Sequence, residues 1–285
     1  MRLSILDNGH RRRARLFFAM TGGDAPDIVR TLLYRPDFFA RPLLAIAVPA
    51  MRGPSFWTPG EREYLAMRTA QLHQCPFCID SHAELTRIAA DCEISPDDPD
   101  SARPELRAVR AFLDSTQSAA PVTAPEGVAE SAVHEALRVD LVWNVVNRLA
   151  NAFGFVLRGD QLHSGTRALH RFGYRFPGLL LSGGDRTDHG DPIANLRYAV
   201  FDASASTAPA LRQAAATGED LAEPWQTYTS LVRDASCRIT DTTIADLRTA
   251  GHGEEEIYEL TVAATVSAAL HTYDTGRQAV ANKPA

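Results

Sequence analysis

The chain has 285 residues, 45% of them hydrophobic and 22% charged, so it can bury a sizeable core in one large domain or two smaller ones. Its formal net charge of -6 argues against a broad surface for nucleic acid or anionic membranes, which needs an excess of Lys and Arg. Four cysteines are too few for a disulfide scaffold, and no apolar run is long enough to span a bilayer. We therefore expect a cytoplasmic protein whose partners are small molecules or other proteins.

Apolar residues recur three and four positions apart through most of the chain, while the alternating pattern of strands is scarce. The sequence therefore predicts an all-α fold. The basic cluster 11–15 near the N-terminus is interpreted as a solvated face. The first clear helix is expected at 59–73, where Thr58 and Glu61 form a capping box and Pro59 suits the first helical position.

The helix at 59–73 carries a carboxylate on its apolar side. Glu63 shares a face with Met67 and Ala70, unlike Glu61 and Arg62. The helical period therefore predicts that Glu63 is buried and available for chemistry inside the protein.

A second helix is predicted to begin at Pro76, with Cys75 at its cap, and to run to about Ala90. Cys78 lies in the first turn, and His82 follows four positions later on the same face. A helix N-terminus stabilises a thiolate through its free N–H groups and its partial positive charge. The pattern therefore predicts a reactive Cys78 beside an imidazole that can take its proton.

Further helices are expected at 104–117 and 131–159, with loops rich in proline, glycine and polar residues between them. The helix at 131–159 is long and apolar, so we expect it to pack centrally. It also carries more apolar surface than one neighbour is expected to cover, which favours a homo-oligomer.

A loop around 183–192 divides the chain, and a segment before this loop is weakly similar in sequence to a segment after it. The segment 127–133 resembles the segment 251–257, and an apolar helix pattern follows each. We expect a first domain, 1–180, that carries the chemistry, and a second helical region, 190–280, that is a degenerate repeat without the cysteine pair.

Glu63 and the run Cys75-Pro-Phe-Cys-Ile-Asp-Ser-His82 resemble the signature of the alkylhydroperoxidase D and carboxymuconolactone decarboxylase superfamily. In that signature a glutamate lies twelve positions before the first cysteine, as it does here. The segment 147–154 resembles the helix that follows the core in peroxidase-like members. The resemblance covers roughly Arg52 to Gly159.

This resemblance implies an all-helical alkylhydroperoxidase D-like fold, assembly as a homo-oligomer and a thiol-dependent peroxidase reaction. It assigns Cys78 as the peroxidatic thiol and Cys75 as the resolving thiol, with Glu63 and His82 as a proton relay. The substrate would be hydrogen peroxide or an organic hydroperoxide and the reductant an unidentified dithiol, and we expect no cofactor or metal. Phe77 departs from the best-studied peroxidase pattern, which has a histidine there. Decarboxylase members lack the cysteine pair, so its presence favours redox chemistry.

Other interpretations of the cysteine pair remain open. A zinc site would use Cys75, Cys78, His82 and Cys92, although a second paired knuckle is missing. A thioredoxin-like domain would place the pair after a buried strand, where this sequence predicts a capped helix. The remaining alternatives are inert packing, a general disulfide oxidoreductase, and a non-catalytic helical oligomer that senses oxidation.

Overall fold

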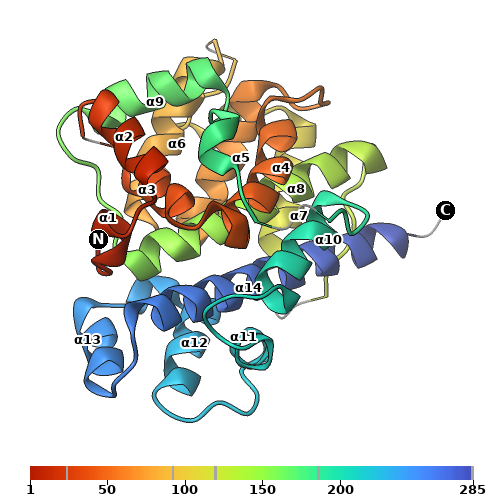
Figure 1. Cartoon of the computed structure of the whole chain (residues 1–285). Coiled ribbons are helices and arrows are strands. Elements are labelled where there is room, and N and C mark those ends of the chain that lie inside the picture. The colour runs from red at the N-terminus through yellow and green to blue at the C-terminus, as the bar shows by residue number, and fades with distance from the viewer. Residues whose placement is uncertain (24, 92, 119–120, 185–186, 284–285) are drawn as a thin grey trace. The chain divides into compact units, whose positions relative to one another are not determined.

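The computed structural model describes residues 1–23, 25–91, 93–118, 121–184 and 187–283. Helices and their connections make up this part of the chain, and no β-strand occurs within it. The all-α prediction is therefore confirmed. Figure 1 shows the helices with their labels.

The chain divides into two compact units, each assembled from separate stretches of sequence. Unit 1 consists of Met1–Ile46, Arg148–Arg158 and Arg175–Ala268. Unit 2 consists of Ala47–Asn147, Gly159–Tyr174 and Ala269–Ala285. This division differs from the predicted one, in which 1–180 and 190–280 are continuous domains. It differs because three long helices, α4, α8 and α14, each contribute residues to both units. The internal repeat stays a prediction.

Unit 2 contains the cysteine pair. Its complete helices are α5 (Pro59–Leu72), α6 (Pro76–Ala89), η2 (Pro99–Ser101), α7 (Pro104–Ser115) and α9 (Gln161–Phe172). It also includes the end of α4 (Arg41–Arg52), most of α8 (Glu130–Phe153) and the end of α14 (Glu254–Ala281). The capping box of α5 and the cap of α6 at Cys75 are present as predicted.

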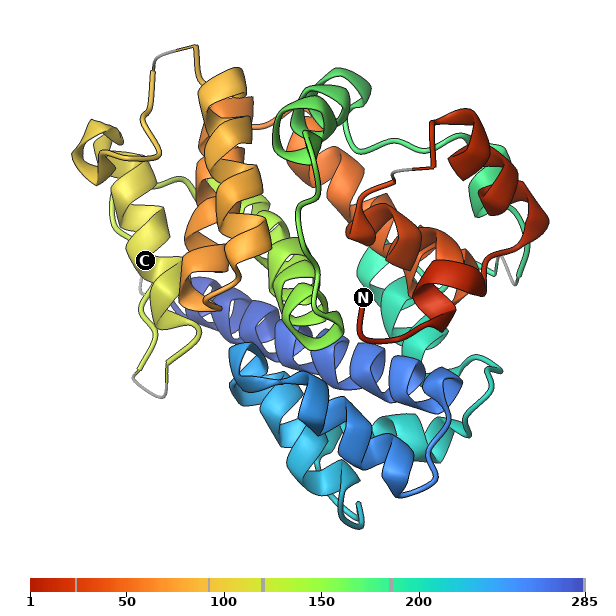
Figure 2. The same ribbon diagram turned by 90° about the vertical axis from the view of Figure 1, so that its left-hand side faces the viewer.

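The helices α5 and α6 form a hairpin and lie side by side (Figure 2). The tight turn between them places Gln74 in the left-handed region, with a φ of 50°. A Cβ atom on Gly60 would lie 2.5 Å from the Cα atom of Ala90, so the start of α5 approaches the end of α6 closely only because residue 60 is glycine. This close packing brings the inner faces of the two helices together.

The helix α5 is buried on more sides than its amphipathic pattern predicts. Glu61 and Arg62 are buried as well as Glu63, and both find polar partners. Arg103 places its Nε atom 2.5 Å from Oε1 of Glu61, and Arg62 donates to the carbonyl of Gly53 at 2.9 Å. Charged groups can be buried where such partners replace water.

The helix α8 is the central packed helix that the sequence predicts, although it ends at Phe153 instead of near 159 because Gly154 takes a φ of 67°. From Leu141 to Ala150 every residue is buried within the single chain. The argument for a homo-oligomer from uncovered apolar surface on this helix therefore does not hold.

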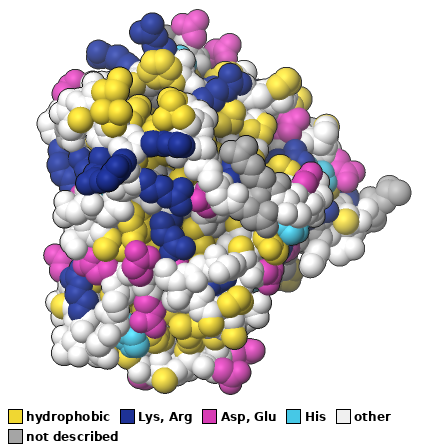
Figure 3. All heavy atoms as spheres, viewed as in Figure 1, with side chains coloured by type: hydrophobic (Ala, Val, Ile, Leu, Met, Phe, Trp, Pro, Cys, Tyr) yellow, Lys and Arg dark blue, Asp and Glu magenta, His cyan; other side chains and the backbone are white. Residues whose placement is uncertain are grey.

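Unit 1 contains the remaining helices. They are α1 (Ile5–Asn8), α2 (Arg12–Met20), α3 (Asp27–Tyr34), η1 (Pro36–Ala40), η3 (Gly178–Leu181), α10 (Pro192–Arg197), η4 (Tyr198–Asp202), α11 (Pro209–Thr217), α12 (Trp225–Asp234), η5 (Ser236–Arg238) and α13 (Asp241–Thr249). Figure 3 shows Lys and Arg side chains gathered over the region of α2, where the arginines of 11–15 are exposed, as predicted.

A buried carboxylate also lies in unit 1, on α14. Glu259 accepts hydrogen bonds from the backbone N–H groups of Ser206 and Thr207, at 2.8 and 2.7 Å. The Thr207 hydroxyl and Arg35 bind the same carboxylate. These bonds hold the segment after η4 against α14.

Candidate active site

The cysteine pair lies at the start of α6, as predicted. Cys75 caps the helix with φ -98° and ψ 97°, and Cys78 follows in the first turn. Both residues are 1% exposed, both sulfurs are free thiols, and the two side chains are close enough to interact. The two thiols are thus already in contact, which favours an intramolecular disulfide.

Burial raises the pKa of the Cys78 thiol well above its ordinary value, and the hydrogen bond and charge of Cys75 raise it further. This direction is opposite to the one predicted from the helix N-terminus, because burial removes the water that would stabilise a thiolate. Cys78 is therefore a thiol at neutral pH in the resting protein. Its reaction as a nucleophile needs a base that takes the proton during the attack.

Glu63 and His82 form a buried pair across the α5–α6 hairpin. The Oε2 atom of Glu63 lies 2.8 Å from the Nδ1 atom of His82, and the two residues are 0% and 2% exposed. The prediction of a buried carboxylate at Glu63 is confirmed. Among the described residues no hydrogen bond joins His82 to Cys78, although the helical repeat places both on one side of α6.

Two further residues, which the sequence analysis did not single out, complete the surroundings of Glu63. Arg52, the last residue of α4, places its Nη2 atom 2.6 Å from Oε1 of Glu63. Tyr174, just beyond α9, donates its hydroxyl to both carboxylate oxygens at 2.9 Å. The guanidinium of Arg52 also lies over the Tyr174 ring, 5.0 Å from its centroid. The carboxylate therefore receives hydrogen bonds from three side chains.

These partners decide the charge of the cluster. Burial alone would raise the pKa of Glu63, but the hydrogen bonds and charges of His82 and Arg52 outweigh it and hold the pKa below its ordinary value. Burial and the Glu63 charge raise the pKa of Tyr174 well above its usual range. Near neutral pH, Glu63 is thus a carboxylate and Tyr174 a neutral hydroxyl donor.

An ionised Glu63 also determines which nitrogen of His82 carries the proton. A carboxylate only accepts hydrogen bonds, so Nδ1 must donate, and a neutral imidazole then leaves Nε2 as an acceptor. Trp143 packs edge-on against the imidazole with ring centroids 3.9 Å apart, and its Nε1 atom is 3.3 Å from the sulfur of Met51. The imidazole is thus fixed on one side by a charge and on another by an aromatic ring, an arrangement suited to a general base.

A second chain of hydrogen bonds joins α5 to α8 beside the cysteine pair. Nε2 of His73 lies 2.7 Å from Oδ1 of Asn144, whose amide donates to Asp140 at 2.7 Å. The hydroxyl of Thr69 donates to the same carboxylate at 2.8 Å. These bonds fix the end of α5 and thereby the turn that leads to Cys75.

The described residues give little support to a metal site or a membrane span. Within this part of the chain, no group of three or more His, Cys, Asp and Glu side chains is placed to hold a metal ion. Cys92, the fourth ligand in the zinc interpretation, lies outside the described residues. None of the helices that the structure describes has both the length and the apolar character needed to cross a membrane.

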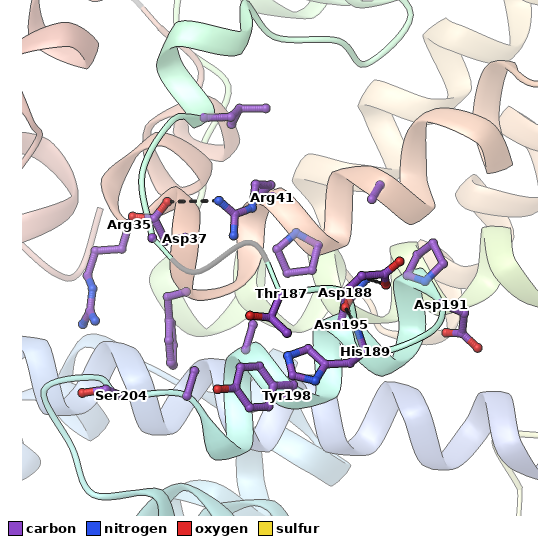
Figure 4. Close-up of a pocket in the computed structure, with 18 of the residues that line it drawn as sticks. Arg35, Asp37, Arg41, Thr187, Asp188, His189, Asp191, Asn195, Tyr198 and Ser204 are labelled. Atoms are coloured by element: carbon purple, nitrogen blue, oxygen red, sulfur yellow. Dashed lines mark hydrogen bonds and ion pairs between the residues drawn. The ribbon is translucent and has the colours of Figure 1, made fainter.

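A pocket of about 1010 Å³ lies in unit 1, and none of its lining residues belongs to the cysteine cluster (Figure 4). Asp37 lies 2.6 Å from Arg11 and 3.8 Å from Arg41, and His189 stacks on Tyr198 with ring centroids 3.7 Å apart. The described lining residues include three arginines and three aspartates, so they favour neither anions nor cations. The candidate active site is therefore the cluster around the two cysteines.

Comparison with known proteins gives a distant likeness in structure. No protein-family model and no curated protein matches the sequence. One similar solved structure is the alkylhydroperoxidase AhpD core of an uncharacterized peroxidase-related protein from Ralstonia eutropha JMP134, with a TM-score of 0.45 and 19% sequence identity. The match covers 60% of this chain and 94% of that chain. At this level, the likeness carries no conclusion about activity.

Proposed function

We propose that this protein is a thiol-dependent peroxidase that reduces hydrogen peroxide or an organic hydroperoxide through Cys78 and Cys75. One observation carries the proposal: two thiols in contact begin the helix that also bears His82, and His82 is held by the buried carboxylate of Glu63. The cluster combines a nucleophile, a base and a resolving group in one place.

The first step oxidises Cys78. Its sulfur attacks the hydroxyl oxygen of the hydroperoxide, the O–O bond breaks, and Cys78 becomes a sulfenic acid. Nε2 of His82 takes the thiol proton as the S–O bond forms and gives it to the departing oxygen, which leaves as an alcohol or water. Glu63 stabilises the imidazolium that exists between the two proton transfers.

The second step forms the disulfide. The thiol of Cys75 attacks the sulfenic sulfur of Cys78, the S–O bond breaks, and water leaves with the Cys75 proton. An external dithiol then reduces the disulfide by two thiol exchanges and is itself oxidised to a disulfide. The closeness of the two cysteines supports this second step, because the resolving thiol already lies beside its target.

The burial of both cysteines bears on the substrate. At 1% exposure, neither sulfur can approach a disulfide on the surface of another protein unless the site opens locally, whereas a small hydroperoxide needs only a narrow path. This favours the peroxidase over a general disulfide oxidoreductase. The same burial means that the reductant reaches the oxidised pair through local opening of the site.

A thiol count tests the proposal. Of the four cysteines, two should be lost on addition of one equivalent of peroxide, and peptide mapping should find a Cys75–Cys78 disulfide. Zinc is measured on the same sample. Stoichiometric zinc, or a disulfide from Cys92 or Cys237 to either residue of the pair, would overturn the proposal.

Turnover separates the enzyme from a redox sensor. A peroxidase consumes many equivalents of peroxide when a dithiol is supplied, whereas a sensor is oxidised once and changes its assembly. The reversible dithiol also suits a reducing compartment, and we propose that the protein works in the cytoplasm. The resemblance of the cysteine motif to the alkylhydroperoxidase D superfamily is the ground on which we also propose a homo-oligomer. Light scattering that finds only a 31.1 kDa particle at micromolar concentration would exclude the oligomer.

A further inference from the structure

The geometry points to Tyr174 as a positioning residue of the peroxidase site, one that binds both oxygens of Glu63 and fixes the carboxylate that orients His82. This inference rests on the proposed function and adds to the site a residue from outside the motif that suggested it. Tyr174 lies 111 positions from Glu63 in the sequence.

The backbone at Tyr174 has an uncommon conformation. Gly173 ends α9 in the left-handed region with φ 65° and ψ 42°, and Tyr174 follows with a φ of 65° as well. Left-handed angles are unfavourable for a bulky side chain and persist where the surroundings require them. Here they accompany a tyrosine that is 6% exposed and whose hydroxyl reaches the buried carboxylate.

The hydroxyl of Tyr174 bridges the two oxygens of the Glu63 carboxylate. Arg52 binds Oε1 of Glu63 and His82 binds Oε2, while the Tyr174 hydroxyl lies 2.9 Å from both oxygens. A carboxylate rotates about its last bond, and donors on both oxygens stop this rotation. Tyr174 therefore keeps Oε2 directed at Nδ1 of His82.

The ring of Tyr174 contacts the same cluster independently of its hydroxyl. Its centroid lies 5.8 Å from the centroid of the Trp143 ring, and Trp143 in turn packs on His82. The guanidinium of Arg52 covers the Tyr174 ring, and a Cβ atom on Gly173 would lie 3.4 Å from the Cγ atom of Arg52. Gly173 and Tyr174 thus pack against Arg52, which binds Glu63, and Tyr174 also packs against Trp143, the neighbour of His82.

Tyr174 acts as a donor and not as an acid or base. Because burial and the Glu63 charge raise its pKa, the hydroxyl stays protonated throughout the working range. A hydrogen bond donated to a carboxylate favours the ionised form. Removal of the hydroxyl should therefore raise the pKa of Glu63, and it should also leave the carboxylate free to rotate away from Nδ1 of His82.

The test measures the ionisation of Glu63 directly. In an infrared titration of the whole protein, the carboxyl band of Glu63 is the one that disappears in Glu63→Gln. Tyr174→Phe should move the midpoint of this band upward by about one pH unit, since a hydrogen bond to a charged group is lost. The same variant should slow peroxide-driven thiol loss about tenfold at neutral pH, because Glu63 is still ionised there but its carboxylate is no longer held in the orientation that directs Oε2 at His82.

Two further proteins complete the experiment. Tyr64→Phe is the matched control. Tyr64 lies on the same helix as Glu63, and its hydroxyl accepts a hydrogen bond from Arg110 at 2.7 Å instead of binding the carboxylate. It should leave the Glu63 midpoint unchanged. Replacement of Tyr174 by 3,5-difluorotyrosine keeps the shape but strengthens the donor, so it should move the midpoint downward. This protein decides the question if Tyr174→Phe does not fold.

The outcomes separate the inference from the proposed function. A Glu63 midpoint that is the same in wild type, Tyr174→Phe and the fluorinated protein overturns the role of Tyr174, whatever the activity. A wild-type protein that shows no peroxide-driven thiol loss overturns the peroxidase, while the titration still reports whether Tyr174 controls Glu63.

Discussion

Glu63 in unit 2 and Glu259 in unit 1 are both 0% exposed and both paired with an arginine, yet the rest of their partners differ in kind. Glu63 is bound by His82 and Tyr174, which are titratable side chains. Glu259 is bound by the backbone N–H groups and a hydroxyl of the segment 206–207.

The comparison shows that a buried carboxylate by itself does not mark an active site. Burial works against the ionisation of both residues, and in both the hydrogen bonds and charges prevail and lower the pKa. A carboxylate held by fixed backbone donors secures a loop. In the peroxidase that we propose, a carboxylate held by an imidazole of the helix that begins with the two cysteines controls where a proton resides. Four predictions test this difference.

The largest effect is expected at the cysteines of unit 2. Cys78→Ser should reduce the peroxide reaction to the uncatalysed rate, whereas Cys75→Ser should stop at a sulfenic acid on Cys78. Mass spectrometry after trapping with dimedone measures both. Cys237→Ser in unit 1 is the control and should react as the wild type does. Trapping of a sulfenic acid on Cys75 in Cys78→Ser, at the wild-type rate, would reverse the assigned roles.

The next largest effect separates Glu63 from Glu259. Glu63→Gln keeps the shape but removes the charge, and we expect it to slow peroxide-driven thiol loss about 100-fold, as typical for loss of acid–base assistance. His82→Ala should slow it at least as much. The double variant should be slowed by far less than the product of the two single-variant factors, because the two residues act as one unit. Rates against pH in the three variants decide this, and independent, multiplying effects would disprove the relay.

A loss of stability without a loss of chemistry is expected for Glu259. Glu259→Ala leaves Arg35 without its buried partner, which costs about 3 kcal/mol. Denaturant unfolding should show the loss, while the rate of thiol oxidation per folded molecule stays at the wild-type value. If the rate falls as it does in Glu63→Gln, the two carboxylates are not different in kind.

The smallest effect concerns acid stability. Both glutamates have a pKa below the ordinary value of 4.5, so each contributes stability that is present above that value and is lost as the pH falls through the pKa of the folded state. The urea concentration at which half of the wild-type protein is unfolded should therefore decrease when the pH is lowered below about 4.5. Glu63→Gln and Glu259→Gln should each flatten this dependence. An unchanged slope in both would mean that neither lowered pKa is real.

The sequence predicts the part of the site that lies within two consecutive helices. The cysteine pair, Glu63 and His82 fall on α5 and α6, where the helical period and one capping box determine which side chains face inward. Arg52 and Tyr174 come from other segments, and no local pattern connects them to Glu63. In the sequence, a tyrosine directly after a glycine indicates only the end of a helix. That the Tyr174 side chain points inward depends on tertiary packing, which no local pattern reveals.

The sequence also predicts the all-α class but not the division of the chain. Periodicity reports local structure, and α4, α8 and α14 each contribute to both units in a way that no boundary signal reveals. The pKa of Cys78 was predicted in the wrong direction for a related reason. The helix N-terminus is visible in the sequence, whereas the depth of burial, which decides the outcome, is not.

The raised pKa of Cys78 has a consequence for chemical labelling. Electrophiles such as maleimides and iodoacetamides react with thiolates, and a buried thiol that keeps its proton reacts slowly. Cys237 is exposed, so it should be modified well before Cys75 and Cys78. A fluorescent probe could thus be attached to unit 1 while the dithiol of unit 2 is left intact, and it would report on the molecule as peroxide is added.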